Sequence, residues 1–152
     1  MLSMQTRALR CHALSQDIEV LTLDNVQLSE PQAHEVQIEI RACAVNFPDI
    51  LMIQGGYQFK PELPFSPGGE FSGVVTRVGS AVDHLQPGDR VVAGERVGGF
   101  SEHINVSAES VRQIPDHVTF AKAASYATAY LTAYVALKVR GHLRPSETLL
   151  VH

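Results

Sequence analysis

The chain has few of the features that mark secreted, membrane-spanning or nucleic-acid-binding proteins. Its 152 residues include only two cysteines, Cys11 and Cys43, which fits a reducing compartment better than a disulfide framework. A formal net charge of -4 gives no electrostatic reason to expect nucleic acid or an anionic membrane surface as a partner. No segment approaches the roughly 18 to 20 apolar residues of a membrane span, and the N-terminus lacks the apolar stretch of a secretory signal. We therefore expect a soluble, cytoplasmic protein that binds neither membranes nor nucleic acid.

Two kinds of binding motif are missing as well. The seven histidines are scattered along the chain, and no two of them stand at the spacing of a metal-ligand pair. The Gly-x-Gly-x-x-Gly pattern of a dinucleotide-binding turn does not occur. The sequence therefore predicts no metal site and no phosphate-binding turn of that type.

Apolar residues make up 45% of the chain and charged residues 18%, as in ordinary globular domains. Over the first 118 residues or so the patterns are those of short β-strands. Apolar and polar residues alternate over 36–43, which predicts a strand with one buried face and places Cys43 on its polar face. Further β-rich runs follow at 73–78, 90–93 and 100–106, separated by glycine and proline turns. Many short strands between such turns indicate a small barrel or sandwich.

Helical patterns interrupt the strands once and then follow them. Residues 47–54 form a short helical patch bounded by a glycine pair. Thr119 is a candidate N-cap for an alanine- and leucine-rich segment of one or two helices, which ends before Gly141. Residues 148–151 are predicted to form a buried strand that is cut short. The fold class is therefore mainly β with a few helices (α+β).

A set of motifs runs in a fixed order along nearly the whole chain. It comprises Cys43-Ala44-Val45-Asn46-Phe47-Pro48-Asp49, Gly55-Gly56-Tyr57, the stretch PFSPGGEFSGVV over 64–75, Gly88-Asp89-Arg90-Val91, GGFSE over 98–102 and Leu131-Thr132-Ala133-Tyr134. In this order and spacing the set resembles the medium-chain dehydrogenase/reductase superfamily. Members have a GroES-like β-barrel catalytic domain and a Rossmann domain, with NAD(P)H held in the cleft between them.

Two positions point to the zinc-free branch of that superfamily. Its zinc alcohol dehydrogenases place a cysteine where Asn46 stands and a histidine where Gly69 stands, and both are metal ligands. Only Glu70 and Asp49 remain nearby, whereas a catalytic zinc needs about three protein ligands. The four-cysteine lobe of those enzymes is missing too, since only residues 92–97 separate the Gly-Asp-Arg-Val turn from the next glycine pair. The resemblance therefore implies the NADPH:quinone oxidoreductase-like branch, without metal.

The resemblance also suggests roles for four residues. Asn46 is expected to face the nicotinamide ring, and its amide can both donate and accept hydrogen bonds. Tyr57 offers a phenol that either bonds the substrate or donates a proton to a developing oxyanion. Asp49 lies near Asn46 and is a third catalytic candidate. Thr132 resembles the family threonine that contacts the nicotinamide end of the cofactor.

Each candidate has a structural alternative. Asn46 and Asp49 can simply cap or brace the helix predicted over 47–54. Tyr57 can be an ordinary half-buried tyrosine, and Thr132 can bond back to its own helix. Glu70 matches a buried family glutamate beside the site, for which we expect a structural role.

The resemblance divides the chain into three parts. Residues 1–123 are the expected GroES-like catalytic domain, 124–147 an inter-domain helical segment, and 148–152 the first strand of a Rossmann domain that is otherwise absent. NADPH would bind the full-length protein, and the chain by itself is expected to bind it weakly and to turn over little or nothing. A homodimer is expected of the full-length protein, because relatives dimerise through the Rossmann domain.

The implied activity is hydride transfer from NADPH to a quinone or to the activated double bond of an enone. Three alternatives stay open. An enoyl thioester reductase of the same superfamily is one, and a zinc alcohol dehydrogenase with displaced ligands is another. The third is a stand-alone binding or structural module, which predicts a well-satisfied surface where a Rossmann domain would dock.

Overall fold

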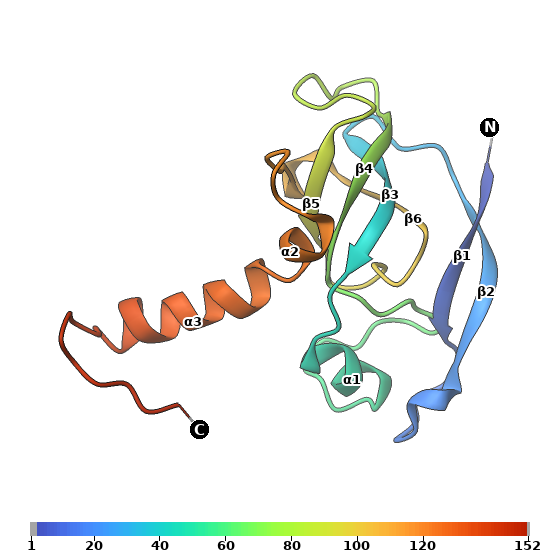
Figure 1. Cartoon of the computed structure of the whole chain (residues 1–152). Coiled ribbons are helices and arrows are strands. Elements are labelled where there is room, and N and C mark those ends of the chain that lie inside the picture. Colours follow the sequence, from blue (N-terminus) through green and yellow to red (C-terminus); the bar gives the residue numbers. More distant parts are fainter. Residues whose placement is uncertain (1–2, 152) are drawn as a thin grey trace.

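The computed structural model describes residues 3–151, in which an antiparallel five-stranded sheet dominates (Figure 1). The strand order across this sheet is β6-β3-β4-β5-β7. The strands are β3 (Glu35–Cys43), β4 (Glu70–Val78), β5 (Arg90–Gly94), β6 (His103–Ser107) and β7 (Val111–Gln113). The prediction of a mainly β fold with a few helices is confirmed.

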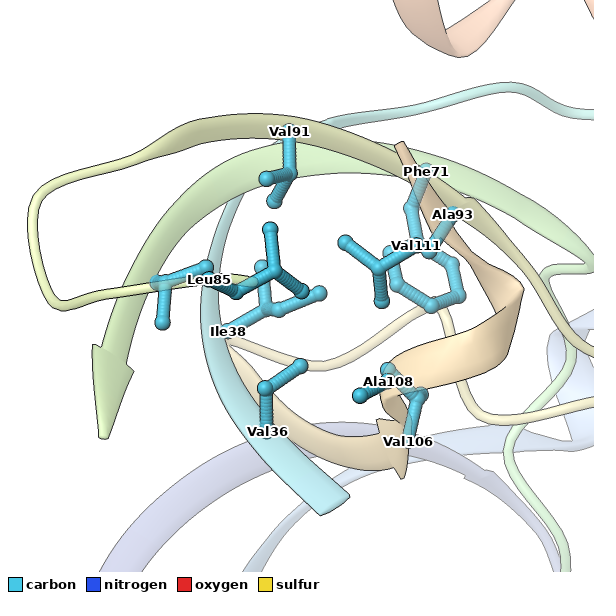
Figure 2. Close-up of a cluster of buried hydrophobic side chains, with 10 residues drawn as sticks. Val36, Ile38, Phe71, Leu85, Val91, Ala93, Val106, Ala108 and Val111 are labelled. Carbon is cyan, nitrogen blue, oxygen red and sulfur yellow. The ribbon is translucent and has the colours of Figure 1, made fainter. Parts of the chain in front are cut away.

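The two edge strands, β6 and β7, are linked only by the 3₁₀ turn η2 (Ala108–Ser110). The edges of a flat five-stranded sheet would lie about 19 Å apart, at about 4.8 Å per strand, which is too far for three residues to bridge. The sheet therefore curls until its edges approach each other, as a barrel requires. Val106 of β6 and Val111 of β7 reach the same core, around which the curved strands lie in Figure 2. The other buried members of this core are Val36, Ile38, Phe71, Val75, Leu85, Val91, Ala93 and Ala108.

A separate antiparallel pair, β1 (Met4–Cys11) and β2 (Leu21–Leu28), lies beside the sheet (Figure 1). The short 3₁₀ turn η1 (Ile18–Val20) leads into β2. An isolated bridge between Cys11 and Phe65 ties β1 to the loop before β4. Neither strand of this pair was predicted from the sequence. In β2 no residue is fully buried, and Leu23 is 63% exposed.

The strict alternation predicted over 36–43 is wrong in detail. The pairing of β3 with β4 shifts twice. The first irregularity leaves Thr76 of β4 without a partner, and the second leaves Arg41 of β3 without one, so the side chains of β3 that follow Arg41 change face. Gln37 is only 2% exposed, and its side-chain amide donates a hydrogen bond of 3.2 Å to a residue of β6. Cys43, predicted on the polar face, packs against the main core.

The predicted helices are present. The helix α1 (Phe47–Ile53) is followed by Gly55, whose φ of +73° suits a glycine. Thr119 caps α2 (Phe120–Ala124), since its hydroxyl oxygen accepts a hydrogen bond of 3.3 Å from the backbone N–H of Lys122.

A longer helix follows α2 and projects away from the sheet (Figure 1). It runs through η3 (Ala127–Leu131), α3 (Thr132–Tyr134) and η4 (Val135–Arg140), of which η3 and η4 are π-type turns. It ends before Gly141, as predicted. No helix within residues 3–151 has the length and apolar character to cross a membrane.

Residues 148–151, predicted as a buried strand, form no strand. They are exposed, with values of 76% for Leu150 and 78% for Val151. A strand needs a neighbour to satisfy its backbone groups, and the sheets formed within residues 3–151 offer none to this segment. His152, the last residue of the predicted strand, lies outside the described residues.

Candidate active-site cleft

A cleft of about 700 Å³ opens between α1, the loop after it, the segment following β5 and the start of the long helix. This volume lies within the range of about 300 to 1,000 Å³ that is typical of small-molecule sites. Asn46, Asp49 and Tyr57, three of the four predicted site residues, line it together. The other lining residues are Pro48, Met52, Gln58, Phe59, Gly69, Glu95, Arg96 and Thr128.

Asn46 and Asp49 stand at the start of α1. A carboxylate oxygen of Asp49 accepts a hydrogen bond of 2.8 Å from the backbone N–H of Asn46. The backbone N–H of Asp49 in turn donates to the main-chain carbonyl of Asn46 at 3.0 Å. These bonds satisfy groups that a helix start leaves without intrahelical partners. They hold Asn46 by its main chain at the rim of the cleft.

The second carboxylate oxygen of Asp49 accepts a hydrogen bond of 2.9 Å from the backbone N–H of Gly68. Asp49 is 2% exposed, so both oxygens are committed to backbone donors inside the protein. Gly68 has a φ of +96°, a conformation that side chains rarely adopt. This geometry favours the bracing alternative for Asp49, which joins α1 to the loop before β4.

Tyr57 follows the glycine turn after α1 and packs against a second, smaller core. Phe59 packs against the same core, whose buried members are Cys11, Met52, Ile53 and Phe65. Both rings also line the cleft. No side chain within residues 3–151 hydrogen-bonds to the Tyr57 hydroxyl, which leaves the phenol available to a ligand.

Glu70 connects the sheet to the long helix. It is 4% exposed, and one carboxylate oxygen accepts hydrogen bonds from the backbone N–H groups of Ala127 and, at 3.1 Å, of Thr128. The other oxygen, Oε2, has no hydrogen-bond partner among the described residues. Glu70 therefore holds the first turn of the helix that brings Thr128 into the cleft, which is a structural role.

Thr132, the fourth predicted site residue, does not line this cleft. It lies one turn further along the helix in a second hollow, together with Thr128, Leu131 and Arg140. Thr128 lines both spaces, and sequence reasoning missed it. The spacing of four residues, which places 128 and 132 on one helix face, was the available signal. A contact between Thr132 and a cofactor stays a prediction.

Cys43 does not line the cleft but packs against the main core. Burial raises the pKa of the Cys43 thiol to about 12, and the negative charge of Asp49 adds to this shift. Burial also raises the pKa of Cys11. Both cysteines are free thiols, and both remain protonated near neutral pH.

The described residues gather no three His, Cys, Asp or Glu side chains that could hold a metal ion together. The cleft is instead lined by an amide at Asn46, a phenol at Tyr57 and a hydroxyl at Thr128. Such groups orient a polar ligand by hydrogen bonds.

The alcohol dehydrogenase GroES-like domain family matches residues 32–116, which is more than half of the chain. The chain belongs to this family. The GroES-like fold predicted from the motifs is thereby confirmed. Among its relatives, a quinone oxidoreductase-like protein 2 homolog from Nematostella vectensis is 40% identical over 147 residues. The matched region is 95% of this chain and 40% of that protein.

Two solved structures support the same placement. A human synaptic vesicle membrane protein VAT-1 homolog-like protein superposes with a TM-score of 0.86 and 34% identity over 93% of this chain and 45% of that one. The Escherichia coli quinone oxidoreductase complexed with NADPH gives a TM-score of 0.81 and 32% identity over 87% of this chain and 40% of that one. The chain is therefore a medium-chain dehydrogenase/reductase of the quinone oxidoreductase-like branch, and it spans about two fifths of the length of these relatives.

Proposed function

We propose that the chain is the substrate-side catalytic domain of a zinc-independent reductase that transfers hydride from NADPH to quinones or α,β-unsaturated carbonyls. The observation that carries the proposal is the convergence of Asn46, Tyr57 and Thr128 on one cleft. Asn46 and Tyr57 flank α1, and Thr128 reaches the same cleft from the long helix. The family is one of oxidoreductases, and its Escherichia coli member was solved with NADPH.

The cleft suits the nicotinamide end of such a cofactor. A carboxamide at Asn46 and a hydroxyl at Thr128 offer both donors and acceptors. NADPH, when bound, supplies the hydride, and the protein has to supply orientation and electrostatics. Thr132, one turn beyond Thr128, is proposed as a further contact at that end.

In a zinc-independent reductase, hydrogen bonds have to polarise the carbonyl of the acceptor. The Asn46 amide and the Tyr57 phenol are donors that can meet a carbonyl oxygen. A hydrogen bond to that oxygen strengthens as negative charge develops on it, which lowers the barrier to hydride arrival. Asp49 positions Asn46 without touching the acceptor, because its carboxylate fixes the main chain of Asn46. Met52 and Phe59 give the cleft an apolar wall against which a flat ring can lie.

The exposed residues of the long helix support the interpretation that the chain is a domain of a larger enzyme rather than a stand-alone module. Tyr126, Tyr130 and Tyr134 are 62%, 65% and 58% exposed, and the first two rings stack with centroids 5.2 Å apart. A contiguous exposed apolar stripe is typical of an interaction face, whereas the stand-alone module predicts a well-satisfied surface. We accordingly propose the division into a catalytic domain (1–123), an inter-domain segment (124–147) and the beginning of a cofactor-binding domain (148–152), with homodimerisation of the full-length protein.

The proposal is tested by NADPH oxidation assays on protein expressed from the full reading frame. The acceptors are 1,4-naphthoquinone, an alkyl enone and an enoyl thioester, each with and without a chelator. We expect oxidation with the quinone or the enone that the chelator does not inhibit. An absence of acceptor-dependent NADPH oxidation would overturn the proposal, as would stoichiometric zinc whose removal abolishes activity.

A second measurement addresses the chain by itself. Titration of NADPH against the 152-residue chain should give millimolar or weaker affinity and negligible turnover, because no glycine-rich turn is present to seat the pyrophosphate. Micromolar affinity would contradict this part of the proposal.

A further inference from the structure

Arg96 is the only cationic residue among those that line the cleft within residues 3–151. It follows β5 and is exposed, and it forms no ion pair with any described residue. Other arginines in the chain are engaged: Arg7 with Glu102, Arg77 with Glu30, and Arg90 with the carbonyls of 115, 116 and 118. The charge of Arg96 therefore has no ion-pair partner among the described residues, although Arg96 lines the cleft.

The guanidinium of Arg96 is nevertheless held in place. Its central carbon lies 4.8 Å from the centroid of the Phe59 ring. A guanidinium over an aromatic face is attracted to it and keeps its N–H groups at the edge free to donate. Phe59 is itself fixed by the second core. The cation is thus oriented before a ligand arrives, which reduces the entropy lost on binding.

The acidic residues of the cleft are engaged elsewhere. Both oxygens of Asp49 accept hydrogen bonds from backbone N–H groups. A carboxylate oxygen of Glu95 accepts a hydrogen bond of 3.2 Å from the hydroxyl of Ser110, away from Arg96. Among the described residues, none accepts a hydrogen bond from the Arg96 guanidinium, and a guanidinium edge is shaped for bidentate recognition of an oxyanion.

We propose that Arg96, stacked on Phe59, forms an oxyanion subsite for the acceptor, so that the preferred substrates are quinones or enones that carry a carboxylate, phosphate or sulfonate group. This inference rests on the proposed function, since it specifies the substrate class of the same cleft. The phosphates of the cofactor are a second source of the same chemistry, and the kinetic design separates the two.

The kinetic experiment compares two quinones, 1,4-naphthoquinone-2-sulfonate and neutral 1,4-naphthoquinone, with protein from the full reading frame. Arg96→Met keeps a long side chain on Phe59 and removes the charge. We expect its kcat/KM for the sulfonate to fall at least about tenfold, the effect of losing one charge-assisted hydrogen bond. For the neutral quinone we expect a change within about twofold, and an unchanged KM for NADPH. For the sulfonate, the kcat/KM of Arg96→Lys should lie between those of the wild type and Arg96→Met.

A binding experiment gives a readout that does not depend on turnover. Naphthalene-2-sulfonate and its neutral sulfonamide are titrated against the 152-residue chain by NMR. The sulfonate should bind more tightly, and this preference should disappear in Arg96→Met and at high salt. The matched control is Arg77→Met, which removes the same charge from an exposed arginine outside the cleft and should change neither measurement.

The outcomes distinguish the two proposals. Equal losses for both quinones, an increased KM for NADPH in Arg96→Met, or no preference between the two naphthalene probes would overturn the oxyanion subsite. Binding preference without any NADPH oxidation would uphold the subsite and overturn the reductase function. Turnover of both quinones that Arg96→Met does not change would uphold the reductase function and overturn the oxyanion subsite.

Discussion

The carboxylate of Glu70 accepts a hydrogen bond of 3.1 Å from the backbone amide of Thr128. Glu70 is the first residue of β4, and Thr128 lies in the first turn of the long helix. This bond, with its companion from Ala127, joins the curved sheet to the segment that completes the cleft. Because Glu70 is 4% exposed, solvent cannot readily replace either bond.

Replacing Glu70 should release the start of the long helix. A hydrogen bond to a charged group contributes about 1.5–3 kcal/mol, so Glu70→Ala is expected to lower the free energy of unfolding by about 2–4 kcal/mol. Glu70→Gln keeps one acceptor oxygen, so its free energy of unfolding should fall less than that of Glu70→Ala. Urea denaturation measures both losses, and hydrogen exchange should accelerate at Ala127 and Thr128. Exposed Glu62 offers the control Glu62→Ala; unchanged exchange at both amides in Glu70→Ala would refute the role given to Glu70.

Two glycines with similar backbone conformations should respond differently to alanine. Gly68 and Gly88 have φ values of +96° and +98°. A Cβ at Gly68 would lie 2.7 Å from the backbone nitrogen of Phe100, whereas a Cβ at Gly88 would meet nothing within 4 Å. Gly88→Ala should therefore cost only the conformational strain, about 1–2 kcal/mol. Gly68→Ala should cost more than about 3 kcal/mol, because backbone has to move.

Denaturation midpoints in urea measure this difference. Gly68→Ala should also weaken the bond from the Gly68 amide to Asp49 and with it any activity of the full-length protein. Equal losses of stability in the two variants would show that the close packing around Gly68 does not determine its identity.

Variants of Asn46 and Tyr57 separate positioning from proton donation. Removing a donor to a developing oxyanion costs about 10²–10³ in kcat, and we expect a loss of about 10² for Asn46→Ala. Tyr57→Phe should lose only about tenfold if the phenol merely bonds the substrate, and more than about 10² if it donates a proton. Gln58→Ala changes another cleft residue and should have little effect. The measurement is NADPH oxidation by the full-length protein, and wild-type rates in Asn46→Ala would exclude its proposed contact.

Because the pKa of the Cys43 thiol is raised, we expect the free energy of unfolding to depend on pH in the alkaline range. Burial raises the pKa of this thiol to about 12 in the folded protein, from the ordinary value of 9.0 for an unperturbed thiol. Below pH 9 both states keep the proton. Between pH 9 and about 12 the unfolded chain releases a proton that the folded protein retains, so the free energy of unfolding falls as pH rises.

The slope attributable to one proton is at most about 1.4 kcal/mol per pH unit. Urea denaturation of wild type and Cys43→Ala from pH 8 to 11 should show a steeper decline in the wild type. Both thiols of the folded protein should also resist a thiol reagent at pH 8 and react after unfolding. Parallel stability curves would mean that the thiol of Cys43 ionises as easily in the folded protein as in the unfolded chain.

Local patterns predicted the helices well. Thr119 and the glycine pair after α1 act on their immediate neighbours, so their effect can be inferred from a few residues of sequence. Strand register was less predictable. The buried side chain of Gln37 hydrogen-bonds to Asn105 of β6 and Thr76 of β4, and Cys43 packs against the core because β3 carries an extra residue, Arg41, in its pairing with β4. Both arrangements involve residues far away in the sequence.

The candidate site divides in the same way. Asn46, Asp49 and Tyr57 were found from motifs within one short stretch, and they share a cleft. Thr128 and Arg96 were missed, since neither belongs to that stretch and each reaches the cleft from another element. Thr132 was chosen by its motif, but the direction of the helix places it in a separate hollow.

The sequence by itself determined the kind of fold, the positions of the helices and the superfamily, because residue type, short-range periodicity and motif order carry that information. Only the tertiary structure decided which side chains share the cleft and which charges in it lack a partner. The closure of the sheet and the bond from Glu70 to the long helix bring distant segments together, and contacts between distant segments leave no pattern in a local stretch of sequence.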